Sequence, residues 1–210
     1  DRDQVWKRNP AQQEEWFGEV LASGDFDGDG YDDLAMASPH RDVGAATDAG
    51  AVVVFYGTGS GLSAAGQQAF NENNAALEDE CESSDEFGFS LGVGDFDADG
   101  YDDLVIGVPG ESFGSGGIVP ASGALHILHG SASGLSTTDA QYLSRVALGF
   151  GWASEQRFAH AVSSGDFDGD GYDDLAIGVP GQDYLSGEDV GAVHVLFGSS
   201  SGINTAGQQF

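Results

Sequence analysis

Three short segments of the chain carry aspartates at a spacing that could hold a metal ion. They read DFDGDGYDD at residues 25–33, DFDADGYDD at 95–103 and DFDGDGYDD at 166–174. In the shared pattern D-x-D-x-D-G-x-x-D, side chains at positions 1, 3, 5 and 9 can converge while position 7 offers its backbone carbonyl. Carboxylates gathered this closely repel one another unless a cation lies among them. Oxygen donors in this number suit Ca²⁺, which accepts about 6 to 8 of them, whereas zinc and copper favour His or Cys.

We expect each segment to bind one Ca²⁺, or about three ions per chain, at the millimolar concentrations found outside cells. Glycine at position 6 permits the backbone conformation that folds the loop around the ion. The aspartates at position 8 are expected to face solvent or support the loop, and they are assigned no ligation: Asp32, Asp102 and Asp173. The predicted metal ligands are Asp25, Asp27, Asp29, Tyr31, Asp33, Asp95, Asp97, Asp99, Tyr101, Asp103, Asp166, Asp168, Asp170, Tyr172 and Asp174.

An EF-hand is the main alternative, because its calcium loop begins in the same way. An EF-hand needs a bidentate Glu at position 12, where this chain has Met36, Ile106 and Ile177. These residues belong to apolar runs typical of strands, and no flanking helices are predicted. A calcium loop carried on a β-hairpin is therefore the favoured interpretation.

The acidic segments are embedded in a longer repeat, since they begin at residues 25, 95 and 166, which are 70 and 71 residues apart. Each repeat predicts four β-strands bounded by glycine, serine or proline. The first strands are predicted at 17–24, 87–94 and 158–165, and the second at 34–39, 104–109 and 175–180. The third are predicted at 50–57, 123–130 and 191–198, and the fourth follow Gly61, Gly134 and Gly202. No long helical period occurs, so the chain is expected to be nearly all β.

Tandem four-stranded sheets indicate antiparallel β-propeller blades, with the calcium loops between the first and second strands of each blade. We expect a single propeller, or propeller segment, over 1–210, with blades at approximately 11–76, 77–147 and 148–210. Residues 1–10 contain DQVWKR, which is expected to complete another blade as its fourth strand. Propellers usually have about 4 to 8 blades, so three should not close alone. A homo-oligomer or a longer propeller is therefore expected.

The Phe-Gly pair is present in the first two repeats, and the acidic loop and the small-x-Pro ending recur in all three. With these motifs the chain resembles the FG-GAP repeats of integrin α-subunit propellers over essentially its whole length. Ala159 departs from this pattern by replacing glycine, and the GAP positions read Ala37-Ser38-Pro39, Gly107-Val108-Pro109 and Gly178-Val179-Pro180. The near-identical repeats and few lysines look more like a bacterial secreted FG-GAP protein than an animal integrin. The resemblance implies calcium loops on one face of a propeller and partners on the opposite face.

The composition is strongly acidic, with 35 acidic and 6 basic residues and a formal net charge of −29. Nucleic acid and anionic membrane surfaces are therefore poor partners. Cys81 is the only cysteine, so no disulfide can form within the chain. No apolar run approaches the roughly 18 residues of a membrane span, and the polar start at Asp1 carries no signal peptide. We expect a mature, excised or engineered form of an extracellular protein, secreted or at the cell surface.

Strand alternation places the loops between second and third strands on the side away from calcium, at 40–49, 110–122 and 181–190. The connections near 71–85 and 146–156 share that side, and these segments vary while the rest repeats, as in a scaffold that carries a binding site. The candidate contacts for a protein or glycan ligand are His40, Arg41, Phe113, Trp152, Tyr184 and Glu188.

One of these connections contains LEDECESSDE at 77–86, with six acids in ten residues. A solvated loop is its first interpretation. A further cation site and a patch for a basic partner are the alternatives.

No catalytic residue is predicted, because the chain has no nucleophile elbow, Cys-His pair or H-E-x-x-H motif. The loop carboxylates are committed to calcium and cannot easily serve as general acids. His126 and His194 occupy matching places in third strands, which indicates packing rather than catalysis. The expected function is a calcium-binding scaffold for extracellular protein or glycan binding or adhesion, and not an enzyme. The alternative is a segment of a secreted propeller enzyme that acts on polysaccharide or phosphoester.

Overall fold

The computed structural model describes residues 16–74, 77, 79–113, 119–151, 153–183 and 190–209. Within these ranges the chain has twelve β-strands and no helix, so the all-β prediction is confirmed. The strands are β1 (Val20–Gly24), β2 (Asp33–Ser38), β3 (Ala51–Tyr56), β4 (Ser63–Phe70), β5 (Ser90–Gly94), β6 (Asp103–Val108), β7 (Ala124–His129), β8 (Ser136–Ser144), β9 (Ala161–Gly165), β10 (Asp174–Val179), β11 (Ala192–Phe197) and β12 (Asn204–Gln209). The strand expected within residues 1–10 lies outside the described residues.

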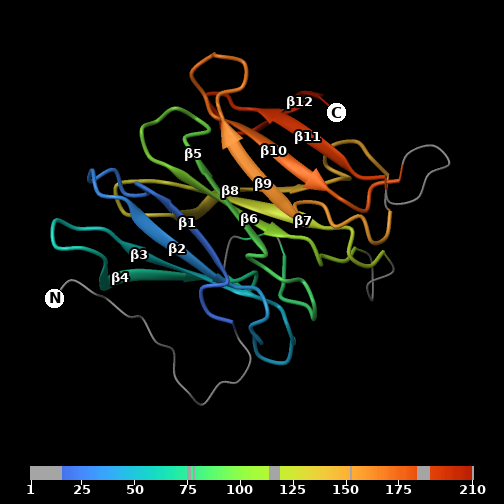
Figure 1. The fold of residues 1–210 in the computed structure, drawn as a ribbon, viewed down its shortest axis with the longest axis horizontal. Helices are drawn as coiled ribbons and strands as arrows, with labels where there is room; N and C mark the ends of the chain where they lie inside the picture. Colours follow the sequence, from blue (N-terminus) through green and yellow to red (C-terminus); the bar gives the residue numbers. More distant parts are fainter. Residues whose placement is uncertain are drawn as a thin grey trace.

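The strands form one four-stranded antiparallel sheet per repeat, as predicted for propeller blades. Blade 1 contains β1 to β4, blade 2 contains β5 to β8, and blade 3 contains β9 to β12. Figure 1 shows the three blades as neighbouring groups, coloured from blue to teal, green to yellow and orange to red. The first strands meet, since β1 packs beside β5 and β5 beside β9. This convergence is the arrangement of blades around a propeller axis.

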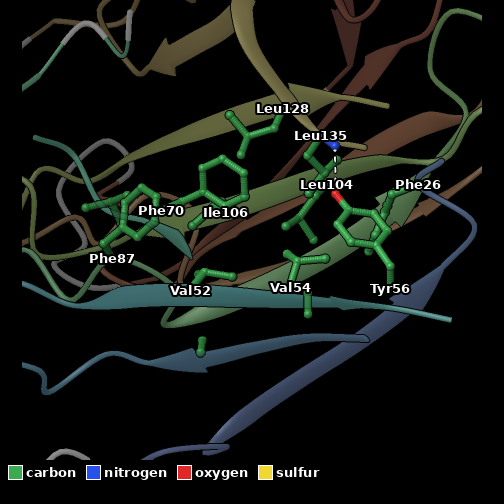
Figure 2. Packing of buried hydrophobic residues seen from close by; sticks show 13 residues of the cluster. Phe26, Val52, Val54, Tyr56, Phe70, Phe87, Leu104, Ile106, Leu128 and Leu135 are labelled. Carbon is green, nitrogen blue, oxygen red and sulfur yellow. Dashed lines mark hydrogen bonds between the residues drawn. The ribbon is translucent and has the colours of Figure 1, made fainter. Parts of the chain in front are cut away.

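The hydrophobic core lies between the blades. A first cluster packs blade 1 against blade 2 (Figure 2) and includes Phe26, Val52, Val54, Leu104 and Ile106. A second cluster packs blade 2 against blade 3 and includes Phe96, Val105, Leu125, Ile127 and Leu175. Successive side chains of a strand point to opposite faces of its sheet, so β6 contributes Leu104 to the first cluster and Val105 to the second.

The two outer faces of this arc carry uncovered apolar side chains. Phe26 and Phe96 are fully buried in the two clusters, whereas Phe167, at the same place in the third acidic loop, is 54% exposed. Leu21 of β1 is 58% exposed, while Leu91 of β5 packs against the first cluster. The three blades form part of a propeller and not a closed ring. Among the described residues, no helix has the length and apolar character needed to cross a membrane.

Candidate metal centre

The acidic loops connect β1 to β2, β5 to β6 and β9 to β10, so all three lie at the same end of their sheets. The carboxylate at position 1 organises each loop. Asp25 Oδ1 accepts a hydrogen bond from the backbone N–H of Asp29 at 3.0 Å, and Asp25 Oδ2 accepts one from Gly30 at 2.9 Å. Asp95 and Asp166 make the same pair of bonds in their loops. The recurring sequence therefore folds into one recurring local structure.

Three carboxylates in each loop lie close enough to share one ion. In each loop, one ligand oxygen from each of the three carboxylates lies within 4.8 Å of the other two; the groups are Asp25-Asp27-Asp29, Asp95-Asp97-Asp99 and Asp166-Asp168-Asp174. Calcium binds oxygen at about 2.3 to 2.6 Å, so two of its ligands can lie no more than about 5 Å apart. The spacing and the all-oxygen donor set both fit a calcium ion.

The aspartate at position 9 of each acidic loop accepts hydrogen bonds from backbone N–H groups, one within the loop and one after the third strand. Asp33 is buried, and it accepts hydrogen bonds from the backbone N–H groups of Phe26 at 2.8 Å and Gly57 at 2.7 Å. Asp103 and Asp174 make the equivalent bonds. Of the three, only Asp174 joins the close group of carboxylates in its loop. Each carboxylate oxygen has a second lone pair, so these bonds leave room for a metal.

Raised carboxylate pKa values in the acidic loops also favour a bound cation. Burial raises the pKa of Asp33 to about 6, and the charges of Asp27 and Asp25 add to this rise. Burial also raises the pKa of Asp97, with Asp103 and Asp99 as further causes. A raised pKa means that the charged carboxylate is disfavoured at its site, and a bound cation would remove that penalty.

His129 is a neighbour of the second loop that the sequence analysis did not single out. Its Nδ1 lies 3.2 Å from Asp103 Oδ2, and this hydrogen bond is the main cause that raises the pKa of His129. Tyr56 and Phe197 occupy the same place in the other blades, so the repeat pattern gives no signal for a histidine here.

The position 8 aspartates link neighbouring loops. Asp102 Oδ2 accepts a hydrogen bond from the Asp25 backbone N–H, and Asp173 Oδ2 accepts one from Asp95. Asp32, which has the same place in blade 1, is exposed. Two of the three residues therefore support a loop, although the loop belongs to the preceding blade. Sequence reasoning missed this because the partners are 77 and 78 residues apart.

The tyrosine at position 7 of the second loop, Tyr101, lies against Gly28 of the first loop. A Cβ added at Gly28 would lie 2.5 Å from the ring of Tyr101. Glycine is therefore needed in the first loop for close packing and for its positive φ of 69°.

The loops at the opposite end carry the residues predicted to meet a partner. His40 lies 3.5 Å from Asp48 and packs edge-on against Trp16, while Phe113 pairs with Val119 through two backbone hydrogen bonds of 3.0 Å. Arg41 is half-buried. Trp152, Tyr184 and Glu188 lie outside the described residues. Among the three that the structure describes, His40 and Arg41 share one loop and Phe113 lies in another.

Two expectations for buried and solvated side chains have different outcomes. His126 and His194 are buried, in keeping with packing roles. The solvated-loop interpretation of residues 77–86 is wrong in part, because Glu80 is exposed but Asp85 is only 1% exposed. Asp85 is buried because blade 2 packs over it, and its carbonyl accepts a hydrogen bond from Gly110 at 3.1 Å.

A family model and several known proteins match this chain. The FG-GAP repeat model matches residues 17–55, 87–128 and 158–196. Integrin alpha-PS5 of Drosophila melanogaster is 33% identical over 80% of this chain and 15% of its own length. Phosphatidylinositol-glycan-specific phospholipase D of Rattus norvegicus is 33% identical over 78% of this chain and 18% of its own length. The chain therefore spans less than a fifth of these relatives.

One solved structure shows a weaker likeness. Rhamnogalacturonan lyase PL11 of Bacillus licheniformis superposes with a TM-score of 0.44 at 19% identity, over 77% of this chain and 28% of the lyase. This similarity is too low to bear on activity.

Proposed function

This chain belongs to the FG-GAP repeat family, and we propose that it is a calcium-stabilised propeller scaffold that binds a protein or glycan ligand outside the cell. One observation carries the proposal: each of three acidic loops brings three carboxylates within 4.8 Å of one another. Since the loops repeat while the distal segments vary, the metal would serve the scaffold and the variable loops would serve recognition.

The ligands of each ion would be the carboxylates at positions 1, 3, 5 and 9 together with the carbonyl at position 7. In the first loop these are Asp25, Asp27, Asp29, Asp33 and the Tyr31 carbonyl. The second and third loops supply the matching residues from 95 to 103 and from 166 to 174. A bound calcium ion supplies positive charge, which offsets the repulsion among these side chains and couples ion binding to folding. Extracellular calcium, at about millimolar concentration, suits loops of this kind.

The partner surface is proposed on the end of the blades opposite the acidic loops. The segments 40–49, 110–122 and 181–190 would form it, with the connections between blades beside them. Several relatives are named as integrin alpha chains, which favours a protein ligand. A homo-oligomer or further blades would complete the ring, because the outer faces of the arc expose Leu21 and Phe167.

A second candidate function is a segment of a secreted propeller enzyme that acts on polysaccharide or phosphoester. It is favoured by the similarity to an enzyme named phosphatidylinositol-glycan-specific phospholipase D. A glycan array and a panel of polysaccharide and phosphoester substrates would separate the two functions. Turnover that is abolished by one substitution in a distal loop would overturn the scaffold proposal.

The calcium part of the proposal is tested by titration of the metal-free chain. Asp97→Ala should remove or weaken one class of calcium site and lower the calcium-induced rise in melting temperature. Asp32→Ala, in an exposed acidic residue without assigned ligation, is the matched control. Equal calcium binding by Asp97→Ala and the parent chain would contradict the assignment.

A further inference from the structure

A second group of carboxylates lies at the joint between blades 1 and 2, away from the acidic loops. Glu72 follows β4, Asp79 lies in the connection to blade 2, and Glu111 follows β6. The ends of β4 and β6 lie at the opposite end of the sheets from the β5–β6 acidic loop. One carboxylate oxygen from each of the three residues lies within 4.8 Å of the other two. The three oxygens are therefore close enough to share one ion, as in the acidic loops, but the group is assembled from distant parts of the chain.

Two of these carboxylates are fully buried and incompletely paired. Glu72 is 0% exposed and Glu111 is 1% exposed. The Oε2 atoms of both residues are buried without a hydrogen-bond partner. Buried carboxylate oxygens are normally paired with a donor or a metal, so two orphans in one group indicate a ligand.

The described residues supply no positive charge to this group. The one basic side chain within ion-pair distance is His126, whose Nε2 lies 3.3 Å from Glu72 Oε1. Burial lowers the pKa of His126 to about 4, so the ring is neutral near pH 7. Glu82 and Asp85 form a second triplet with Glu111 and add to the negative potential.

The carboxylates bear an electrostatic penalty in this environment. Burial raises the pKa of Glu111 to about 9, with Asp79 and Asp85 as further causes. Such groups either take up protons or bind a cation. A surface depression lined by Glu72, Asn73, Asn74 and Asp79 borders the group on its solvent side, next to the buried carboxylates.

The next joint provides an internal comparison. The strand registers place Arg145 after β8 where Glu72 follows β4. When the repeats are aligned, Gln156 occupies the position of Asp85 and Gln182 occupies the position of Glu111. The joint between blades 2 and 3 thus has a guanidinium and two amides where the first joint has three acids. One joint carries its own cation, whereas the described residues of the other supply none to its acids.

We propose that Glu72, Asp79 and Glu111 bind a divalent cation of the hard, oxygen-seeking class, such as Ca²⁺, at the joint between blades 1 and 2. The ion would hold the connection after β4 against the start of the β6–β7 loop. It would fasten this joint at the end opposite the acidic loops, where Gly110 already donates to the Asp85 carbonyl at 3.1 Å.

The test is the number of calcium ions bound per chain, measured by equilibrium dialysis and calorimetry on the metal-free protein. Glu111→Gln should bind one ion fewer than the parent chain, or bind that ion at least tenfold more weakly. Glu80→Gln changes an exposed acid in the same connection and should leave binding unchanged. Equal stoichiometry and affinity for Glu111→Gln and the parent chain would overturn the proposal.

A second variant covers the case in which Glu111→Gln fails to fold. The triple change Glu72→Arg, Asp85→Gln and Glu111→Gln installs the residue types of the next joint. It should fold, bind one ion fewer and lose part of its calcium-dependent gain in melting temperature. If it folds and binds as many ions as the parent chain, the site does not exist. Because Asp97→Ala removes an acidic-loop ion instead, failure of this proposal is distinguishable from failure of the calcium loops.

Discussion

Asp102 forms hydrogen bonds with both the backbone N–H and the backbone carbonyl of Asp25. The Asp102 carboxylate accepts a hydrogen bond of 2.8 Å from the Asp25 N–H, and the Asp102 N–H donates to the Asp25 carbonyl at 3.1 Å. Asp173 and Asp95 repeat this pair of bonds at the next joint. Since Asp25 is position 1 of an acidic loop, the packing of one blade helps to position the metal loop of the blade before it.

Asp102→Ala should therefore weaken the joint between blades 1 and 2. A hydrogen bond to a charged group contributes about 1.5 to 3 kcal/mol, and Asp102 is half-buried, so we expect a loss of about 1 to 2 kcal/mol in the free energy of unfolding. Denaturant unfolding in saturating calcium measures the loss. Asp32→Ala is the control, because Asp32 is exposed at the same repeat position. Equal stability of the two variants would show that the cross-blade bonds contribute nothing.

Removal of calcium should destabilise the whole arc. A ligand that binds only the folded state stabilises it by about 2.7 kcal/mol at a hundredfold excess over its dissociation constant. Chelation should lower the melting temperature, and Asp27→Ala, Asp97→Ala and Asp168→Ala should each remove part of the calcium-dependent gain. Calorimetry with and without chelator measures this, and a melting temperature indifferent to calcium would refute the role of the loops.

His194→Val should change the pH dependence of stability. Burial lowers the pKa of His194, with Arg145 as a further cause, so the folded chain resists a proton that the unfolded chain accepts below about pH 6.5. Stability from the neutral ring is present above that pH and is lost as the pH falls, by at most about 1.4 kcal/mol per unit.

Val53 has the same strand position in blade 1, where it is half-buried, so valine is compatible with the strand at this position. Denaturant unfolding between pH 7 and 5 should show the parent chain losing more stability than the variant. A constant difference between the two across that range would contradict the prediction.

Ala98→Gly should stabilise the second acidic loop. Ala98 is exposed and has a φ of 55°, in the left-handed region that disfavours a Cβ, while Gly169 has the same place in the third loop. We expect a gain of about 0.5 to 1 kcal/mol, because relief of backbone strain exceeds the added chain entropy.

Gly169→Ala is the reverse change. A Cβ there would have open space around it, so backbone strain alone should lower stability by about 1 kcal/mol. Denaturant unfolding measures both changes. Equal free energies of unfolding for the two variants and the parent chain would contradict this explanation.

Local patterns were predictable where their parts are close in sequence. The acidic loops place their candidate ligands within nine consecutive residues, so spacing alone predicts that the side chains converge. The strands follow from apolar runs bounded by glycine and proline, and the repeat period predicts the blades. The burial of Asp85 and the role of Asp102 were not predictable in this way, because both depend on contacts with another blade.

The sequence by itself determined the repeat, the strand order within each blade and the donor types of the acidic loops, because these depend on neighbouring residues and backbone preference. Only the tertiary structure decided which acids lose contact with water. Glu72 meets His126, which is 54 residues away, and Glu111 through the packing of two blades. Burial sets the local dielectric and the available partners, so identical carboxylates become solvated side chains at one place and a candidate cation site at another.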